Sequence, residues 1–188
     1  MEIDLFRGEL ARVSDILMPG GVPWAVAAGA AVYLYTSNRP PTDLDVLVRP
    51  EDLAEVGKLM GITPETEATS WGEVTTIQLG RIEIAGHLVA RWGSNSYPYF
   101  LDSDMAGHLR SITYHGIQVP VLSPEDLVAL KAVLQRGPEQ GKHDLEDVAA
   151  LAAATPMDAA YVRLRLDRMQ ALERALPALQ RWEWAARL

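Results

Sequence analysis

Apolar residues recur with two different periods along the chain, and these periods predict its helices and strands. In residues 4–17 the apolar side chains follow helical spacing, and the Pro and Gly residues of 19–23 end that helix. Pro50 starts a later helix that has acidic residues in its first turn. The predicted elements of this part are a helix over 4–17, a strand over 24–29, a helix over 30–38, a strand over 44–48 and a helix over 50–61.

The pattern changes to strands and then to helices in the second part of the chain. Gly80 separates two apolar strand segments and predicts a hairpin turn, and the segment 92–105 has no regular pattern. Ser123 followed by Asp126 resembles a capping box at the start of a helix, and Pro177 is expected to break the last helical run. The predicted elements are strands over 73–79, 81–89, 108–116 and 117–122, then helices over 127–135, 142–154, 158–176 and 179–188.

This order of elements predicts an α+β fold. Residues 1–122 are expected to form a mixed β-sheet flanked by helices, and residues 123–188 a C-terminal helical region. The chain has 188 residues, of which 48% are hydrophobic, so it has enough apolar material for one sizeable core.

Composition excludes several classes of protein. The chain has no cysteine, which excludes disulfides and thiolate metal sites. It has no apolar run of membrane-spanning length, and its start is acidic where a secretory signal is basic, so we expect a cytoplasmic protein that does not act in the membrane. The net charge of −8 argues against strong binding to duplex DNA, because phosphate contacts need a basic surface. It is compatible with a nucleotide held through metal ions.

Two aspartates, Asp43 and Asp45, lie in the stretch RPPTDLDVLV. Residues two apart in a strand project from the same face, so these carboxylates are expected to lie side by side, with Cα atoms about 6–7 Å apart. Like charges at this separation repel unless a cation lies between them, and hard oxygen ligands suit Mg²⁺. A solvent-facing strand start with an Asp turn cap is the ordinary alternative.

Three further features add to this pair, although each has a structural explanation of its own. Gly29 follows a buried strand and precedes a helix, where backbone N–H groups can approach a phosphate. Glu83 interrupts two isoleucines in a strand, which an exposed strand face would also explain. Lys131 lies among leucines on a predicted helix, from which its side chain could also extend to solvent.

Together these features resemble the DNA polymerase beta-like nucleotidyltransferase superfamily, in its small bacterial and archaeal branch. The resemblance covers residues 24 to about 151. Members have a strand, a Gly-Gly or Gly-Ser turn, a helix, an Arg and a Thr or Ser just before D-x-D, and a third carboxylate on a later strand. These positions are filled here by Ala28-Gly29-Ala30, by Arg39, Thr42, Asp43 and Asp45, and by Glu83. Lys131 and the pair Asp144 and Asp147 resemble a later segment of the abortive-infection toxin-like nucleotidyltransferases.

The resemblance implies transfer of a nucleoside monophosphate from an NTP to a hydroxyl group of RNA, a protein or a small molecule. It implies that Asp43, Asp45 and Glu83 hold Mg²⁺ or Mn²⁺, with Glu83 as a ligand or general base. The turn Ala28-Gly29-Ala30 would hold phosphates with Thr42 nearby. Arg39, Lys131 and Lys142 would offset the charge of the triphosphate.

Two alternatives remain open from the sequence. The usual hydroxyl-bearing turn residue is absent from Ala28-Gly29-Ala30, which favours a catalytically idle nucleotidyltransferase fold that acts as an antitoxin or binds a partner. Trp182 and Trp184 in the C-terminal region could dock on such a partner or on the chain's own core. An aminoglycoside or lincosamide adenylyltransferase is the other possibility, with the same active-site logic and a small-molecule acceptor.

Overall fold

A mixed sheet of eight strands organises the fold. In the computed structural model, which describes residues 1–188, the strands pair in the order β3-β4-β5-β2-β1-β8-β7, and β6 pairs with β5. The strands are β1 (Trp24–Val26), β2 (Leu44–Val48), β3 (Glu65–Thr69), β4 (Gly72–Leu79), β5 (Ile82–Trp92), β6 (Asn95–Tyr99), β7 (Arg110–Tyr114) and β8 (Ile117–Val121). Pairing is parallel between β2 and β5 and between β1 and β8, and antiparallel elsewhere. The α+β class predicted from the sequence is confirmed.

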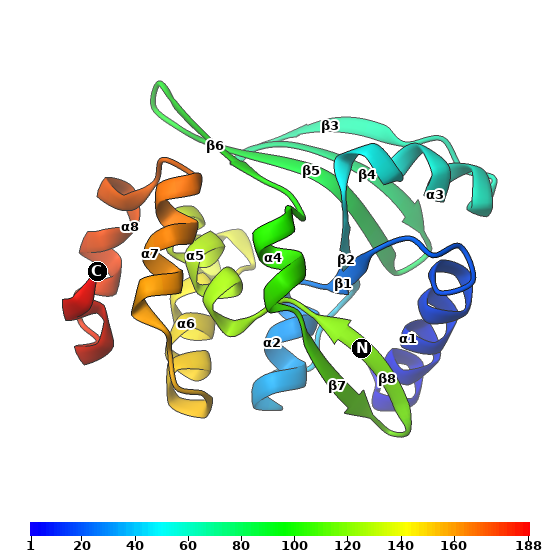
Figure 1. Cartoon of the computed structure of the whole chain (residues 1–188), viewed down its shortest axis with the longest axis horizontal. Helices are drawn as coiled ribbons and strands as arrows, with labels where there is room; N and C mark the ends of the chain where they lie inside the picture. Colours follow the sequence, from blue (N-terminus) through cyan, green and yellow to red (C-terminus); the bar gives the residue numbers. More distant parts are fainter.

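Helices surround this sheet, and the later ones gather on one side of the molecule (Figure 1). The α-helices are α1 (Ile3–Leu17), α2 (Ala28–Thr36), α3 (Leu53–Met60), α4 (Ser103–His108), α5 (Pro124–Leu134), α6 (Asp144–Ala154), α7 (Ala159–Arg168) and α8 (Leu172–Leu179). Short 3-10 helices are η1 (Pro50–Asp52), η2 (Pro138–Gln140) and η3 (Glu183–Arg187). None of these helices has both the length and the apolar character needed to cross a membrane.

Strand β2 lies between antiparallel β1 and parallel β5 and sets the geometry of the sheet centre. Its residues Leu44, Val46 and Val48 are buried, as strand alternation requires for the face that packs into the core. Asp45 projects from the opposite face. The parallel register places Glu83 of β5 directly beside Asp45, so the two acidic side chains lie on the same face of the sheet.

Helix α5 joins the sheet to the C-terminal helices. All of its residues are buried, because it contacts α2 on one side and α6, α7 and α8 on others. The predicted N-cap is confirmed: the Ser123 hydroxyl accepts a hydrogen bond from the Asp126 backbone N–H at 3.1 Å. The Asp126 carboxylate accepts from the Ser123 hydroxyl at 2.6 Å, whereas in a capping box it would accept from the Ser123 backbone N–H. The hydrophobic core runs from helix α1 through the sheet to Ala185 without interruption.

Several predicted elements differ from the observed ones in the middle of the chain. The segment 92–105 was expected to be irregular, yet it contains β6 and the start of α4. Alternation is present in β6, where Tyr97 and Tyr99 are buried, and the Asp102 carboxylate caps α4 by accepting from the Met105 N–H at 2.9 Å. Strand β3 has no apolar pattern because it is a largely exposed edge strand, and it was not predicted.

The prediction that Pro177 breaks the C-terminal helical run is wrong. Pro177 lies inside α8, and the predicted helix over 158–176 instead divides into α7 and α8. The break is at Gln170, whose backbone is left-handed with φ of 54°, and the Ala171 N–H bonds back to the Leu166 carbonyl. This is the hydrogen bond of a Schellman ending, which stops a helix through backbone geometry.

Helix α2 begins earlier than the sequence pattern predicts. The strand expected over 24–29 is only β1, and α2 starts at Ala28. A single residue, Ala27, therefore joins the end of β1 to the start of α2. Its N–H donates to the Asp45 carbonyl at 2.9 Å. This bond fixes the start of α2 against the strand that carries Asp45.

Candidate active site

A cavity of about 450 Å³ lies where the open face of the sheet meets α2, α5 and the start of α6. The end of the β3–β4 hairpin also contributes to its wall. Nearly all the residues singled out from the sequence line it, namely Ala28, Gly29, Arg39, Thr42, Asp43, Asp45, Glu83, Lys131, Lys142, Asp144 and Asp147. The exception is Ala30, whose side chain is fully buried in the core and does not face the cavity.

Three carboxylates converge on one region of the cavity wall. Asp45 and Glu83 are neighbours across the β2–β5 pair, and Asp43 precedes β2 on the same face as Asp45. The Thr42 hydroxyl donates to Asp43 Oδ1 at 3.1 Å, and Arg81 donates to the Thr42 carbonyl at 3.1 Å. These bonds hold the chain that leads into β2, and with it the Asp43 carboxylate.

Burial and neighbouring negative charges raise the pKa values of Asp45 and Glu83. Burial, together with the charges of Asp43 and Glu83, raises the pKa of Asp45 to about 7. Burial also raises the pKa of Glu83, with Asp43 as the next cause. The charge of Lys142 opposes both shifts. The carboxylates therefore lack a cation strong enough to offset their repulsion, as expected for a site that receives one.

The N-terminus of α2 faces the same cavity. Ala28 has a left-handed backbone with φ of 45°, a conformation that costs energy for a residue with a Cβ. No side chain caps this helix, so N–H groups of its first turn remain available to a ligand. A Cβ placed on Gly29 would meet no atom within 4 Å, which shows that this position borders open space.

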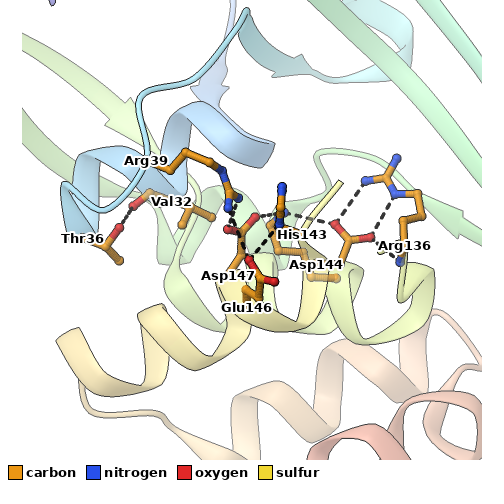
Figure 2. Close-up of polar contacts among 9 residues, drawn as sticks. Val32, Thr36, Arg39, Arg136, His143, Asp144, Glu146 and Asp147 are labelled. Atoms are coloured by element: carbon orange, nitrogen blue, oxygen red, sulfur yellow. Dashed lines mark hydrogen bonds and ion pairs between the residues drawn. The ribbon is translucent and has the colours of Figure 1, made fainter. Parts of the chain in front are cut away.

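Two of the predicted phosphate-binding cations are held by acidic partners. Lys131 Nζ lies 2.7 Å from Asp147 Oδ2 and 3.2 Å from Asp144 Oδ1, and all three side chains are buried. Arg39 Nη2 lies 2.6 Å from Asp147 Oδ1. Figure 2 shows Arg39, from the segment after α2, pointing at Asp147 on α6. The pair Asp144 and Asp147 thus orders cations at the cavity wall.

Asp144 also binds Arg136, a residue that the sequence analysis did not single out. Arg136 Nε and its backbone N–H each lie 2.9 Å from Asp144 Oδ2. Burial alone would raise the pKa of Asp144, but the hydrogen bonds from Arg136 and the charge of Lys131 outweigh it and lower the pKa. Asp144 therefore stays ionised and holds both Lys131 and Arg136 in place. Figure 2 shows its contacts with Arg136.

Two more cavity residues escaped the sequence analysis. Glu67 projects from the edge strand β3, and its charge contributes to the raised pKa of Glu83. Trp71 lies at the β3–β4 turn and forms the far wall of the cavity. No sequence pattern indicated that Glu67 or Trp71 belongs to the site, because β3 has no apolar alternation and the turn is distant in sequence from the aspartates. Both come to the site through strand pairing alone.

The carboxylates fit a divalent cation by their chemistry. Asp43 and Asp45 offer hard oxygen donors on one face. Burial and the charges of Asp43 and Glu83 raise the pKa of Asp45, and a cation would oppose both effects. As they stand, no group of three or more acidic or histidine side chains is arranged to hold a metal ion. Asp43 and Asp45 therefore offer two carboxylate donors on one face, without a complete set of protein ligands.

Comparison with known proteins shows a family and a fold that the chain shares with them. Residues 4–184 match the profile of a family described as uncharacterised nucleotidyltransferases. No curated protein is significantly similar to the chain in sequence. A candidate nucleotidyltransferase of Thermotoga maritima has 20% sequence identity and a TM-score of 0.50, over 65% of this chain and 80% of that chain.

A second solved structure covers more of the chain. It is ANT(2″)-Ia in complex with adenylyl-2″-tobramycin, with 13% identity and a TM-score of 0.53, over 88% of this chain and 99% of that chain. At these identities the likeness is one of fold.

Proposed function

We propose that this chain, which belongs to a family of uncharacterised nucleotidyltransferases, transfers a nucleoside monophosphate from an NTP to a hydroxyl acceptor with the help of Mg²⁺ or Mn²⁺. The observation that supports this most is the register that sets Glu83 beside Asp45, in a cavity that also contains Asp43 and the uncapped start of α2. An acidic group and a phosphate-binding helix start within one cavity are what phosphoryl chemistry requires.

Asp43 and Asp45 would hold the cation, and Glu83 would complete the ligand set or receive the proton of the acceptor hydroxyl. Bound there, a divalent cation would neutralise phosphate charge and make the acceptor oxygen a better nucleophile. Burial raises the pKa of Glu83 above that of an ordinary glutamate, which makes its carboxylate a stronger base for the acceptor hydroxyl. The attacking oxygen bonds to the α-phosphorus as the bond to the pyrophosphate oxygen breaks, and pyrophosphate leaves.

The α2 N-terminus and the nearby cations would hold the triphosphate. The uncapped backbone N–H groups of the first turn of α2 lie at the positive end of the helix dipole, which favours an anion, and Gly29 leaves space for a close approach. Arg39, Lys131 and Lys142 line the same cavity. Because Asp144 and Asp147 already order Arg39 and Lys131, these cations need little rearrangement to face a phosphate.

For the acceptor we propose a small hydroxylated molecule rather than RNA or a protein. The fold likeness to ANT(2″)-Ia, whose structure contains an adenylylated tobramycin, supports this choice. The size of the cavity also suits small ligands, since such sites usually measure about 300–1,000 Å³. We also propose that the cytoplasm is the site of action, because the NTP substrate is available there.

The alternative is a catalytically idle fold that binds a protein partner, such as an antitoxin. Trp182 and Trp184, the residues that could dock on such a partner, are partly buried against the chain's own core. This packing weakens the case for a partner-binding surface in the C-terminal region. The two tryptophan rings stack at a centroid distance of 6.5 Å, and Ala185 beside them is buried. The strained backbone of Ala28 gives the idle fold no support, because strain is common at working sites.

The test is transfer of label from α-³²P-labelled NTPs to a panel of aminoglycosides, lincosamides, total RNA and proteins. We expect a labelled small-molecule product with Mg²⁺ or Mn²⁺, and none from the double variant Asp43→Asn/Asp45→Asn. Arg168→Ala, which alters an exposed ion pair far from the cavity, is the matched control. Absence of any labelled acceptor, together with tight binding of a protein from the same cells, would support the idle fold instead.

A further inference from the structure

The turn between β3 and β4 places an aromatic ring at the end of the cavity opposite the carboxylates. Trp71 lies at this turn and lines the cavity with part of its surface exposed. Its carbonyl accepts from the Arg91 N–H at 2.8 Å, which ties the turn to β5. Gly72 follows with φ of 152°, and a side chain there would overlap the Val89 carbonyl. The backbone that presents Trp71 is thus fixed.

Arg136 reaches over the Trp71 ring from the other wall. It follows helix α5, and its Cζ atom lies 5.2 Å from the ring centroid. The chain's other arginine–tryptophan contacts are closer: Arg174 lies 4.0 Å from the centroid of Trp92, and Arg181 4.3 Å from that of Trp182. The Trp71 face is therefore only loosely covered, although Asp144 fixes the guanidinium beside it.

Between Trp71 and the pair Asp45 and Glu83, the cavity wall is apolar on β4, β5 and α5, whereas Glu67 and Thr69 make it polar on β3. Val74 and Leu88 are paired across β4 and β5 and both line the cavity, as does Leu134 of α5. A flat, weakly polar ring fits the apolar side of this stretch better than a phosphate, which would lose hydration against Val74 and Leu88 and be repelled by the charge of Glu67. One end of the cavity is thus built for charge and the other for an apolar ring.

We propose that the nucleobase of the NTP stacks on Trp71 and that Arg136 donates hydrogen bonds to the edge of the base. This inference rests on the proposed function and adds the base-binding part of the site. Stacking on an aromatic ring accepts any base, because every base has a π face. The guanidinium of Arg136 has N–H groups free to donate to carbonyl or ring nitrogen acceptors on the base edge.

The position of Asp144 supports this arrangement. Asp144 bonds both Lys131, proposed to meet phosphate, and Arg136, proposed to meet the base. Because the Asp144 carboxylate contacts both Lys131 and Arg136, these two cations lie close together. A single nucleotide can therefore contact both. A cationic acceptor is a poorer occupant of the Trp71 face, because Arg136 already places a positive charge over that ring.

The test compares two probes that share their phosphates but not their base. The dissociation constants of a non-hydrolysable ATP analogue and of inorganic tripolyphosphate are measured with Mg²⁺ by calorimetry. We expect Trp71→Ala to weaken binding of the ATP analogue by about tenfold or more and to leave tripolyphosphate binding unchanged. Trp71→Phe should retain most of the affinity. Trp92→Ala, which removes a similar arginine–tryptophan contact outside the cavity, should change neither constant.

Each other result overturns the inference in a distinguishable way. Equal affinity of wild type and Trp71→Ala for the ATP analogue would show that the base lies elsewhere, while leaving nucleotide binding at the carboxylates intact. Equal loss of both probes would mean that Trp71 supports the cavity and does not contact the base. Binding of neither probe by the wild type would refute the proposed function together with this inference.

Discussion

Glu83 on β5 lies directly beside Asp45 on β2, because these two strands pair in parallel register. The residues are far apart in sequence, and only the sheet brings their carboxylates to one face. Asp43 adds a third negative charge, and the pKa of Asp45 rises to about 7 as burial and its acidic neighbours oppose ionisation. The folded protein therefore disfavours the ionised form of Asp45, and a bound cation would stabilise that form.

We predict that Asp45→Asn stabilises the metal-free protein while abolishing binding of Mn²⁺. The folded-state pKa lies above that of an ordinary aspartate, so ionised Asp45 destabilises the folded state at pH 8. One pKa unit corresponds to about 1.4 kcal/mol, and water in the cavity reduces the penalty, so we expect a gain of about 1–2 kcal/mol. Urea unfolding of both proteins in EDTA at pH 8 measures this difference in the free energy of unfolding.

The gain should shrink as the pH falls from 8 toward 4, because Asp45 of the wild type then becomes protonated in the folded state. Asp15→Asn, at an exposed acid remote from the cavity, is the control and should leave stability nearly unchanged. An Asp45→Asn variant no more stable than the wild type at pH 8 would contradict the repulsion inferred here.

The second prediction concerns the pH dependence of metal binding. A carboxylate must be ionised to bind a cation, so Mn²⁺ affinity should be constant above about pH 8 and fall below the Asp45 pKa of about 7. The slope should approach about tenfold per pH unit, because binding then releases one proton. Calorimetry in buffers of different ionisation enthalpy measures both quantities. Affinity that stays constant down to pH 5 would show that Asp45 does not bind the metal.

The third prediction is that Ala28→Gly stabilises the protein. Ala28 has φ of 45°, which is unfavourable for alanine and ordinary for glycine. Relief of this strain exceeds the entropy that glycine adds to the unfolded chain, so we expect a net gain of about 0.5–1 kcal/mol by urea unfolding. Ala30→Gly, two residues further in the same helix and fully buried, should be destabilising. Similar losses from both substitutions would rule out strain at Ala28.

The fourth prediction concerns the buried ion pairs that tie α7 to α4 and α5. Arg165 lies 2.7 Å from Asp102 and 2.9 Å from Asp126, and both Arg165 and Asp126 are buried. Arg165→Ala should destabilise the protein by about 3–5 kcal/mol, because it leaves Asp126 charged and without its partner. Thermal and urea unfolding measure the loss.

Arg168→Ala provides the matched comparison for that variant, since its pair with Asp104 is exposed. We expect it to cost less than about 1 kcal/mol. Equal effects from Arg165→Ala and Arg168→Ala would mean that the buried pair adds little to the folded state. Because burial raises the pKa of Asp126, the difference between the two variants should narrow at low pH, where Asp126 is protonated.

The sequence by itself determined the elements whose patterns are local. Apolar spacing located the helix over 4–17, the strand that carries Asp45 and directly follows Asp43, and the strand that carries Glu83. Ser123 with Asp126 indicated the start of α5. The aspartate pair needs only strand alternation to share a face, and the order of the motifs indicated the nucleotidyltransferase superfamily, which the family match confirms.

Only the tertiary structure decided the elements and contacts that depend on distant residues. Strand β3 is polar and forms because β4 offers it a hydrogen-bonding edge, and α7 ends through the left-handed backbone of Gln170, which no residue pattern announced. The cavity wall made by Glu67, Trp71 and Arg136 assembles from two separate segments, the β3–β4 hairpin and the residues after α5. Periodicity records which face of an element is buried, whereas strand register and helix docking depend on the total burial and hydrogen bonding of the whole chain.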